Sequence, residues 1–508
     1  MRKKVITALL ALVLATSGLS PVYGNSPYSP IVEDVTENRL EENHQEEWLS
    51  VEERIYGLSL IWRYLAEMSP HMSALPAEFD WNALYLEYIS KVINAQGMAE
   101  YYEILSRFVA LLGDGKSMLQ ANYTYIFPIS VRYIDSRYVV YAVNPDFADI
   151  PVGSVIVSID GIDTNYFLES TWGDMLGNHT PKTRQNFLAN RLQGGLRANS
   201  FAIEALTPDG EIIYETISFI PIPEDLTELF VGVESLQDER IAVEDMISLI
   251  GADVVVHEGD IHHIIIHGFG NPAMPESVRQ YIENVADSAQ AFIFDVRRTG
   301  GGAADWVILS QFADVREFGS VRAYRQVRDA GPMGLAALFI MQEALGAELP
   351  EELWELTIHG YSIRQGRDMF ESRHLEELYA IEGSDLWDAN IHYEQSLRLF
   401  DIPVVILSGY MGGSAVENFI VAVQGAENFT VMGTNTMGMG GDMIMFLLPG
   451  EILFGLNLTR QYLPNGQVLN NYGIAPDIWV QQSLSDLLNG IDTQLVYALE
   501  YLSEKLSE

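Results

Sequence analysis

The second half of the chain alternates short apolar runs with helix-length segments, and this alternation restricts the possible fold more than any other feature of the sequence. Strands that alternate with helices in this way usually form a parallel sheet that the helices cover. We predict strands at 261–267, 291–296, 403–407, 429–433 and 443–447, and helices after Pro275, after Ala303 and from near Ser414. The region 223–508 is therefore predicted to be an α/β core, with an insertion of unassigned role at 313–400.

The first half of the chain contains two different periodicities. Ser50 and Glu53 have the spacing of a capping box at the start of a helix, and apolar residues then recur at helical intervals. From about residue 119 the apolar residues alternate as they do in strands, most clearly at 155–159. We therefore predict an N-terminal helical domain at 49–118 and a compact β-rich module at 119–222.

The first 24 residues have the layout of a secretory signal peptide. Three basic residues precede an apolar stretch from Val5 to Ala15, and small residues follow. This stretch is too short to span a bilayer, although an uncleaved anchor is the alternative. Residues 25–48 are polar and acidic, and we predict a flexible leader there. The chain contains no Cys, which excludes disulfides and a lipid anchor on a Cys. The signal peptide at 1–24 therefore predicts a secreted protein.

The chain is strongly acidic, with 70 Asp and Glu residues against 29 Lys and Arg residues and a net charge of −41. Such a charge repels nucleic acid and anionic membrane surfaces, so neither is an expected partner. It is compatible with a well-solvated surface, with cationic partners, or with a saline or alkaline environment. The sequence leaves the oligomeric state open.

The segment 403–418 is an apolar strand that leads through glycines into a serine and then into a helix. This arrangement presents the hydroxyl of Ser414 at the end of a strand and directs the free N–H groups of the helix N-terminus toward the same point. A hydroxyl nucleophile beside donors for an oxyanion is what acyl transfer requires. The alternative is that Ser414 only caps the helix.

A second segment, 291–302, is an apolar strand that ends in Gly300, Gly301 and Gly302. A turn of three glycines can bring bare backbone N–H groups close to a ligand, which would provide a second source of oxyanion donors. A purely structural glycine-rich loop is the alternative interpretation.

Taken in order, the motifs of the chain resemble those of the serine peptidases of the C-terminal processing (tail-specific) and tricorn type. The matching motifs are Asp295 to Gly302, Ser414-Ala415-x-Glu417, Gly433 to Gly438, the Pro-Asn-Gly turn at 464–466, and Gly473 to Asp477. The β-rich module, through 151–161, resembles the family's PDZ-like peptide-binding domain, and the helices resemble its N-terminal helices. The resemblance implies a ClpP/crotonase-like α/β peptidase core and a polypeptide substrate or peptide ligand.

The chain departs from this family at the general base. The tail-specific branch has a Lys 25 residues after the nucleophile, where this chain has Met439. The tricorn branch has a His after the N-terminal helices, where this chain has Lys116, and a Glu near the position of Asn470. Lys occurs at only four positions after residue 24, so its presence here favours a Ser414–Lys116 dyad in which burial makes the lysine a base. Alternatively, the base is lost and Lys116 is a solvated loop residue.

The predicted site comprises Ser414 as nucleophile, Lys116 as general base, and Gly301, Gly302 and Ala415 as oxyanion donors. The predicted function is that of a secreted serine-type endopeptidase without a cofactor. Two alternatives stay open: a catalytically degenerate member that binds a peptide or an apolar ligand, as the retinoid-binding relatives of the family do, and a hydrolase of another acyl substrate.

The histidines at 257–267 are a weaker candidate for a functional site. His263 and His267 would share one face of a strand, but the spacing fits no standard zinc pattern, so we predict no metal site.

Overall fold

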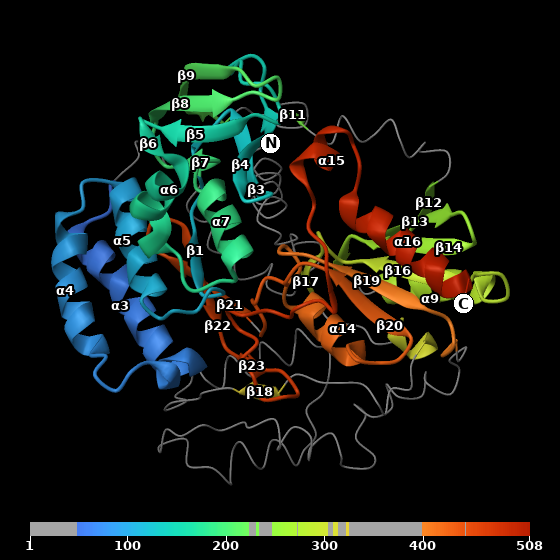
Figure 1. The fold of residues 1–508 in the computed structure, drawn as a ribbon. Helices are drawn as coiled ribbons and strands as arrows, with labels where there is room; N and C mark the ends of the chain where they lie inside the picture. Colours follow the sequence, from blue (N-terminus) through green and yellow to red (C-terminus); the bar gives the residue numbers. More distant parts are fainter. Residues whose placement is uncertain are drawn as a thin grey trace, which may run out of the picture.

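Three parts of the chain lie side by side in the computed structural model (Figure 1): a helical part, a β-rich module and an α/β core. The structure describes residues 48–222, 230–232, 246–271, 273–302, 308–312, 322–324, 399–441 and 443–507. The predicted signal peptide at 1–24, the leader up to residue 47, the start of the helix predicted after Ala303 and almost all of the insertion at 313–400 lie outside these residues. None of the helices in the described ranges has the length and apolar composition that crossing a bilayer requires.

The helical part consists of α3 (Val51–Met68), α4 (Trp81–Asn94) and α5 (Met98–Ala110), with a short 3-10 helix, η1 (Pro70–Ala74), between the first two. The predicted capping box is present, because the N–H of Glu53 donates to Ser50 Oγ at 3.2 Å and the N–H of Ser50 donates to Glu53 Oε2 at 2.9 Å. The three helices enclose their own apolar core, so the helical pattern of the sequence is confirmed.

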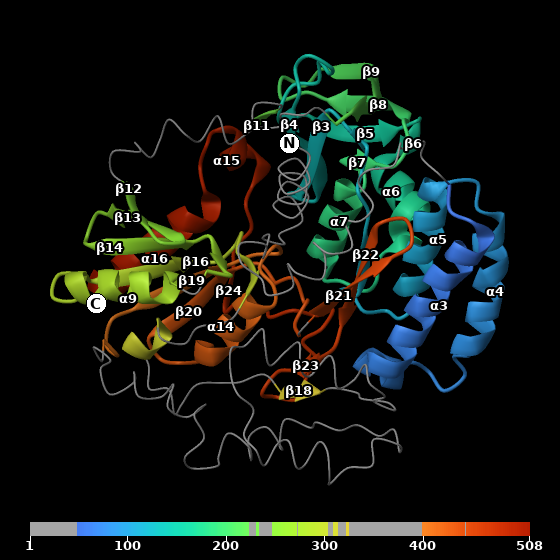
Figure 2. The same ribbon diagram turned by 180° about the vertical axis from the view of Figure 1, so that it is seen from behind.

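The strand expected at 443–447 exists, but its predicted place in the parallel sheet was wrong. This strand, β21 (Met443–Leu448), pairs with β22 (Ile452–Asn457), which pairs with β1 (Met118–Gln120) in a separate antiparallel sheet. The sheet lies against the helical part (Figure 2) and its apolar side chains complete the helical core. A tight turn with Gly450 at a φ of +82° folds the chain back, so that β21 and β22 form an antiparallel hairpin.

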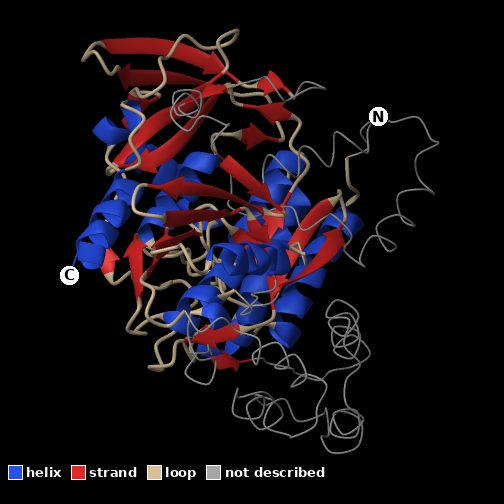
Figure 3. Ribbon diagram, turned by 90° about the vertical axis from the view of Figure 1, so that its right-hand side faces the viewer, coloured by secondary structure: helices blue, strands red, loops and turns tan. Residues whose placement is uncertain are grey.

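The β-rich module contains two sheets (Figure 3, top) and two helices that the sequence did not predict. The helices are α6 (Thr164–Trp172), followed by η2 (Gly173–Met175), and α7 (Pro181–Asn190). The smaller sheet has the order β10 (Ile220–Pro221), β2 (Tyr125–Ile126), β7 (Gly194–Gly195). The larger has the order β11 (Val231–Gly232), β4 (Arg137–Val143), β5 (Val155–Ile159), β8 (Ser200–Leu206), β9 (Ile212–Ser218), with β3 (Ile129–Ile134) on β4 and β6 (Ile162–Asp163) on β5.

The α/β core is a seven-stranded sheet, parallel from its third strand onward, which confirms the predicted architecture. Its order is β12 (Met246–Leu249), β13 (Ala252–His257), β14 (Ile261–Ile266), β16 (Ala291–Asp295), β19 (Val404–Ser408), β20 (Phe429–Gly433), β24 (Ile478–Trp479). The helices are α9 (Met274–Val285), α14 (Ala415–Val423), α15 (Leu484–Leu488) and α16 (Thr493–Ser507). Short elements are η4 (Leu309–Gln311), β18 (Arg322–Tyr324) and β23 (Arg460–Tyr462).

The two central strands of the core are buried on both faces. In β16, Phe292 and Phe294 pack with α9 and α14, whereas Ile293 packs with α16 on the opposite face. Every residue of β16 and β19 is buried, as expected for parallel strands covered by helices. The carboxyl ends of both strands meet at one edge of the sheet, where open α/β sheets bind their ligands.

Arg297, directly after β16, connects the sheet to the start of α16. Its guanidinium forms ion pairs with Asp295 and Asp492, and its side chain is only 16% exposed. We expect Arg297→Met to lower the free energy of unfolding by about 3–5 kcal/mol, because two shielded carboxylates would lose their cation. Urea unfolding measures this. Arg63→Met, at the exposed pair with Glu67, is the control and should cost less than about 1 kcal/mol; equal losses would contradict the argument.

Candidate active site

Ser414 lies at the turn between β19 and α14, where the sequence predicted the nucleophile. The backbone at Ser414 has a φ of +56° and a ψ of −112°. A residue with a side chain rarely adopts a positive φ, and strain of this kind concentrates at functional sites. Ala415 is the first residue of α14, so its N–H is one of the free donors at the N-terminus of the helix.

Gly301 lies against the hydroxyl of Ser414. It belongs to β17 (Gly300–Gly302), which pairs with β15 (Gly268–Phe269) beyond the end of the main sheet. A Cβ placed on Gly301 would lie 3.1 Å from Ser414 Cβ and 3.2 Å from Ser414 Oγ, so only glycine leaves the backbone exposed to this hydroxyl. Gly302 is needed for another reason, since its added Cβ would lie 2.2 Å from the carbonyl carbon of Phe269 and would prevent the close pairing with β15.

Lys116 reaches the same hydroxyl from the opposite end of the chain. Its Nζ lies 3.2 Å from Ser414 Oγ, and it also donates a hydrogen bond to the carbonyl of Gly441. Lys116 is only 5% exposed, so it is not the solvated loop residue of the alternative interpretation. The two side chains that the sequence paired are therefore in hydrogen-bond contact.

Asp114 holds the backbone that carries Lys116, a role that the sequence did not reveal. Its carboxylate accepts hydrogen bonds from the N–H of Lys116 at 3.3 Å and from the N–H and hydroxyl of Ser117 at 3.0 and 2.7 Å. The Asn457 amide and the His71 ring also approach it, at 3.3 and 3.5 Å. Burial alone would raise the pKa of Asp114, but these neighbours together hold it below its usual range.

Two further segments fix the position of this loop. Asn471 bridges it, accepting from the N–H of Gly115 at 3.0 Å and donating to the carbonyl of Gly113 at 2.8 Å. From the module, the first turn of α7 bonds to loops on either side of the nucleophile: Thr183 Oγ1 donates to the Tyr410 carbonyl at 3.0 Å, and Thr180 Oγ1 to the Thr436 carbonyl at 3.3 Å. The helical part, the module and the core therefore all contribute to one site.

Glu417 is fully buried below Ser414 and orders its surroundings. Its carboxylate accepts from the N–H of Ser414 at 3.1 Å, from Thr436 Oγ1 at 2.8 Å and from the N–H of Gly438 at 2.6 Å. Burial raises the pKa of Glu417 to about 7, although these hydrogen bonds and the charge of Lys116 act in the opposite direction. The spacing of Ser414 and Glu417, which is that of a capping box, was the sequence signal for this contact.

The family positions that this chain has replaced do not supply a base. Met439 is buried and its thioether cannot serve as the proton acceptor. Asn470 is fully buried and makes backbone contacts, accepting from the N–H of Gln461 at 2.6 Å and donating to the carbonyl of Gly440 at 2.8 Å. Lys116 is therefore the basic side chain that the described residues place at the nucleophile.

The histidines at 257–267 have separate partners. His263 lies 3.4 Å from Asp295, and His267 lies 2.9 Å from Asp253. β14 ends at Ile266, so the strand that was expected to align the two rings does not reach His267. Among the described residues, His, Asp and Glu side chains form no cluster of three that could hold a metal ion.

Comparisons with known proteins find a likeness between the core and one family of peptidases. Residues 260–480 match the family model described as Peptidase family S41. The carboxy-terminal-processing protease of Bartonella bacilliformis is 33% identical to this chain over 95 residues, which is 18% of this chain. The match spans about a fifth of that relative, 21% of its length.

Solved structures extend the likeness beyond residues 260–480. Mature CPAF matches with a TM-score of 0.61 and 15% identity, over 90% of this chain and 96% of that chain. Mature CPAF complexed with lactacystin matches with a TM-score of 0.60 and 15% identity, over 90% of this chain and 98% of that chain. At this identity the likeness concerns the fold alone, and it agrees with the predicted α/β architecture.

The titration of Glu417 gives a prediction that concerns stability. Because burial raises the pKa of Glu417 from 4.5 to about 7, the folded state binds this proton more tightly than the unfolded state does. The stability that the proton contributes is present below about pH 4.5 and is lost as the pH rises to about 7. We expect the difference in unfolding free energy between wild type and Glu417→Gln to fall by up to about 3 kcal/mol across this range.

Urea unfolding of both proteins at three pH values across this window measures the difference. Glu52→Gln, at an exposed position in the first turn of α3, is the control and should show no such trend. A wild-type advantage over Glu417→Gln that is independent of pH would show that Glu417 stays ionised throughout.

Proposed function

We propose that this chain is a serine endopeptidase of family S41 in which Ser414 and Lys116 form the catalytic dyad. The observation that carries the proposal is the distance of 3.2 Å between Lys116 Nζ and Ser414 Oγ, with Gly301 against the same hydroxyl. This distance is within the range at which a base takes a proton from a nucleophile. The S41 family model and the peptidase relative support the reaction class.

The proposed reaction is an acyl transfer in two steps. Ser414 Oγ attacks the peptide carbonyl while neutral Lys116 takes the hydroxyl proton, and the N–H groups of Gly301 and Ala415, with Gly302, stabilise the oxyanion. The tetrahedral intermediate collapses, the C–N bond breaks, and Lys116 returns the proton to the leaving amine. Water then attacks the acyl-enzyme, Lys116 takes a proton from it, and Ser414 recovers its proton as the acid leaves.

The proposed substrate is an unstructured polypeptide. The β-rich module resembles a PDZ-like domain, and in the S41 family such a domain holds polypeptides, often by the C-terminus. The hydrogen bonds from Thr180 and Thr183 to the loops beside the nucleophile support a module that positions substrate at the site. We propose that the β-rich module is a PDZ-like domain.

Variants of the dyad test the proposal. We expect Ser414→Ala to abolish cleavage of casein and Lys116→Met to reduce kcat/KM by at least about 100-fold, since a positioned base contributes roughly 10²–10⁴. A lysine accepts a proton only when neutral, so wild-type activity should rise between about pH 6 and pH 10. Lys91→Met, on the exposed surface of α4, is the matched control and should keep its activity.

The results of these experiments distinguish the proposed dyad from its alternatives. Cleavage that survives in Lys116→Met would leave Ser414 as the nucleophile but remove Lys116 as its base. A wild type as inert as Ser414→Ala, and unreactive toward a fluorophosphonate probe, would contradict the peptidase and favour the peptide-binding or apolar-ligand-binding protein.

We also propose that the chain is exported, because residues 1–24 have the order of a signal peptide. Expressed with its own N-terminus in a bacterial host, the protein should be found outside the cytoplasm with a mature N-terminus near residue 25. Cytoplasmic protein that still begins at Met1 would contradict the export proposal.

A further inference from the structure

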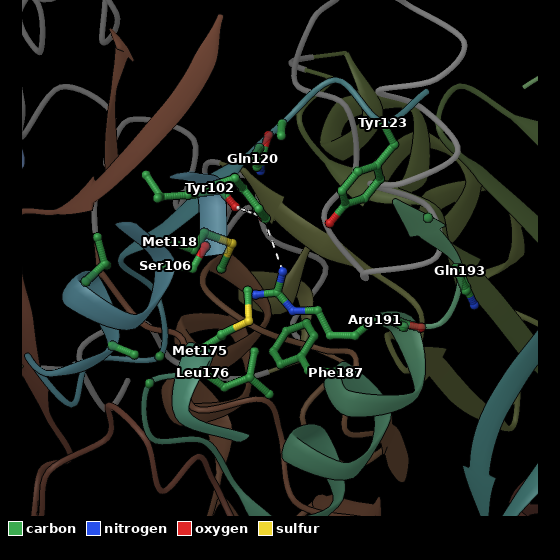
Figure 4. A pocket seen from close by; sticks show the side chains of 18 of the residues that line it. Tyr102, Ser106, Met118, Gln120, Tyr123, Met175, Leu176, Phe187, Arg191 and Gln193 are labelled. Atoms are coloured by element: carbon green, nitrogen blue, oxygen red, sulfur yellow. Dashed lines mark hydrogen bonds between the residues drawn. The ribbon is translucent and has the colours of Figure 1, made fainter. Parts of the chain in front are cut away.

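A cavity of about 160 Å³ lies between the helical part and the β-rich module, behind the loop that carries Lys116. Figure 4 shows that its walls come from α5, from the segment around β1 and β2, from η2 and from the end of α7. The lining is mainly aromatic and aliphatic, with Met118, Met175, Leu176 and Phe187 among its side chains. A cavity of this size holds a molecule about as large as benzene.

Arg191 brings a positive charge into this apolar space. Its Nη1 donates a hydrogen bond to the hydroxyl of Tyr102 at 3.2 Å, and its guanidinium also contacts Tyr123. Burial raises the pKa of Tyr123, so this phenol is neutral and does not compensate the charge. The described residues that line the cavity include no Asp or Glu, and Arg191 has no ion-pair partner within the described ranges.

An arginine without a carboxylate partner among the described residues is unusual in a chain with a net charge of −41. The neighbouring arginines are paired with carboxylates, Arg184 with Glu169 at 2.7 Å and Arg197 with Glu103 at 3.4 Å. A guanidinium largely shielded from water is costly unless an anion accompanies it. Arg191 is therefore preorganised for an anion that the described residues do not supply, and a carboxylate matches its planar donors.

Two further polar groups in the cavity wall have unused hydrogen-bonding capacity. Ser106 is only 2% exposed, and its hydroxyl has no partner among the described residues. Within the same described part of the chain, Nδ1 of His179 is buried and unpaired, and burial lowers the pKa of His179 to about 3, so the ring is neutral. A buried polar atom without a partner is rare and indicates a missing ligand or water.

The cavity also adjoins the proposed base. Gly115 and Ser117, on either side of Lys116, are among its lining residues. Gly115 packs so closely on the His179 ring that an added Cβ would lie 2.5 Å from Nδ1. An occupant of the cavity therefore contacts the segment that positions Lys116.

We propose that this cavity binds a carboxylate carried on a short apolar group, with the carboxylate on Arg191 and the apolar group between Met175, Leu176 and Phe187. The occupant also stabilises the segment 115–117, a consequence that bears on catalysis only if the proposed function holds. The same chemistry is found in a small free acid and in the C-terminal residue of a polypeptide that ends in an apolar side chain.

Calorimetric titration of the full chain with hexanoate tests the site, with hexanamide as the neutral ligand of equal shape. We expect saturable binding of hexanoate, at least about tenfold weaker binding of hexanamide, and at least about tenfold weaker binding of hexanoate to Arg191→Met, since a charge-assisted bidentate pair is lost. Arg197→Met, outside the cavity and 64% exposed, is the matched control and should bind as wild type does.

A second variant guards against an effect of Arg191 on folding. Ser106→Leu keeps the guanidinium and fills the cavity, so it should also abolish binding while thermal unfolding stays cooperative. Hydrogen exchange of the peptide covering 113–119 should slow when wild type is saturated with hexanoate, and this readout is independent of peptidase activity. Unchanged exchange would overturn the stabilisation of the segment.

Competition separates the two sources of the carboxylate. A short peptide with a free C-terminal leucine that displaces hexanoate with higher affinity, while its amide does not, identifies a polypeptide end as the occupant. Displacement by free acids alone identifies a small acid. Equal binding of hexanoate and hexanamide, or the absence of saturable binding by any of these ligands, would overturn the site.

Discussion

The site depends on holding the segment Gly113–Ser117 beside Ser414. Lys116 in this segment and Ser414 are 298 residues apart in the chain. The core sheet carries Ser414 and Gly301 on neighbouring strand ends, but the described residues of the core place no basic side chain beside them. Lys116 comes instead from the connection between the helical part and the module. The hydrogen bonds of Asp114 with Asn457 and of Gly115 with Asn471 cross from this connection to the core, so the tertiary fold brings Lys116 to Ser414.

The hairpin of β21 and β22, which lies outside the parallel sheet, also helps to hold the segment Gly113–Ser117 beside Ser414. By pairing with β1, β22 joins the core to the strand that directly follows Lys116. The hairpin also covers the helical part with apolar side chains, and this burial stabilises the junction. A core without this hairpin would keep Ser414 but would lose the contact of Asn457 with Asp114, which helps to position the loop of Lys116.

The buried charged side chains near the site have specific partners. Arg297 compensates two carboxylates at the end of β16, and Glu417 receives three hydrogen bonds below the nucleophile. Arg191 differs because its guanidinium bonds to the phenols of Tyr102 and Tyr123 and has no carboxylate partner among the described residues. Since desolvation disfavours an isolated charge, this difference is what makes the cavity beside Gly115 a candidate binding site rather than a packing defect.

Much of the fold could be predicted because apolar periodicity reports directly on local structure. The strands of the core and the start of α14 at Ser414 follow from runs and turns that are continuous in sequence. In contrast, α7 was missed because its sequence, Pro-Lys-Thr-Arg-Gln-Asn-Phe-Leu-Ala-Asn, has few apolar residues, and neighbouring elements rather than periodicity stabilise it. The role of Asp114 was also missed, since His71 and Asn457 approach it from distant parts of the chain.

The sequence by itself predicted Ser414 as the nucleophile, Gly301 beside it, and the replacement of the two bases that are usual in the family it resembles. These features lie within short segments whose residue types have local geometric consequences, such as a strand that turns through glycines into a helix. Only the tertiary structure decided that Lys116 is buried and lies 3.2 Å from Ser414, and that Arg191 faces a cavity behind it. Both facts depend on contacts between separate parts of the chain, which no local pattern encodes because packing brings them together only in the folded state.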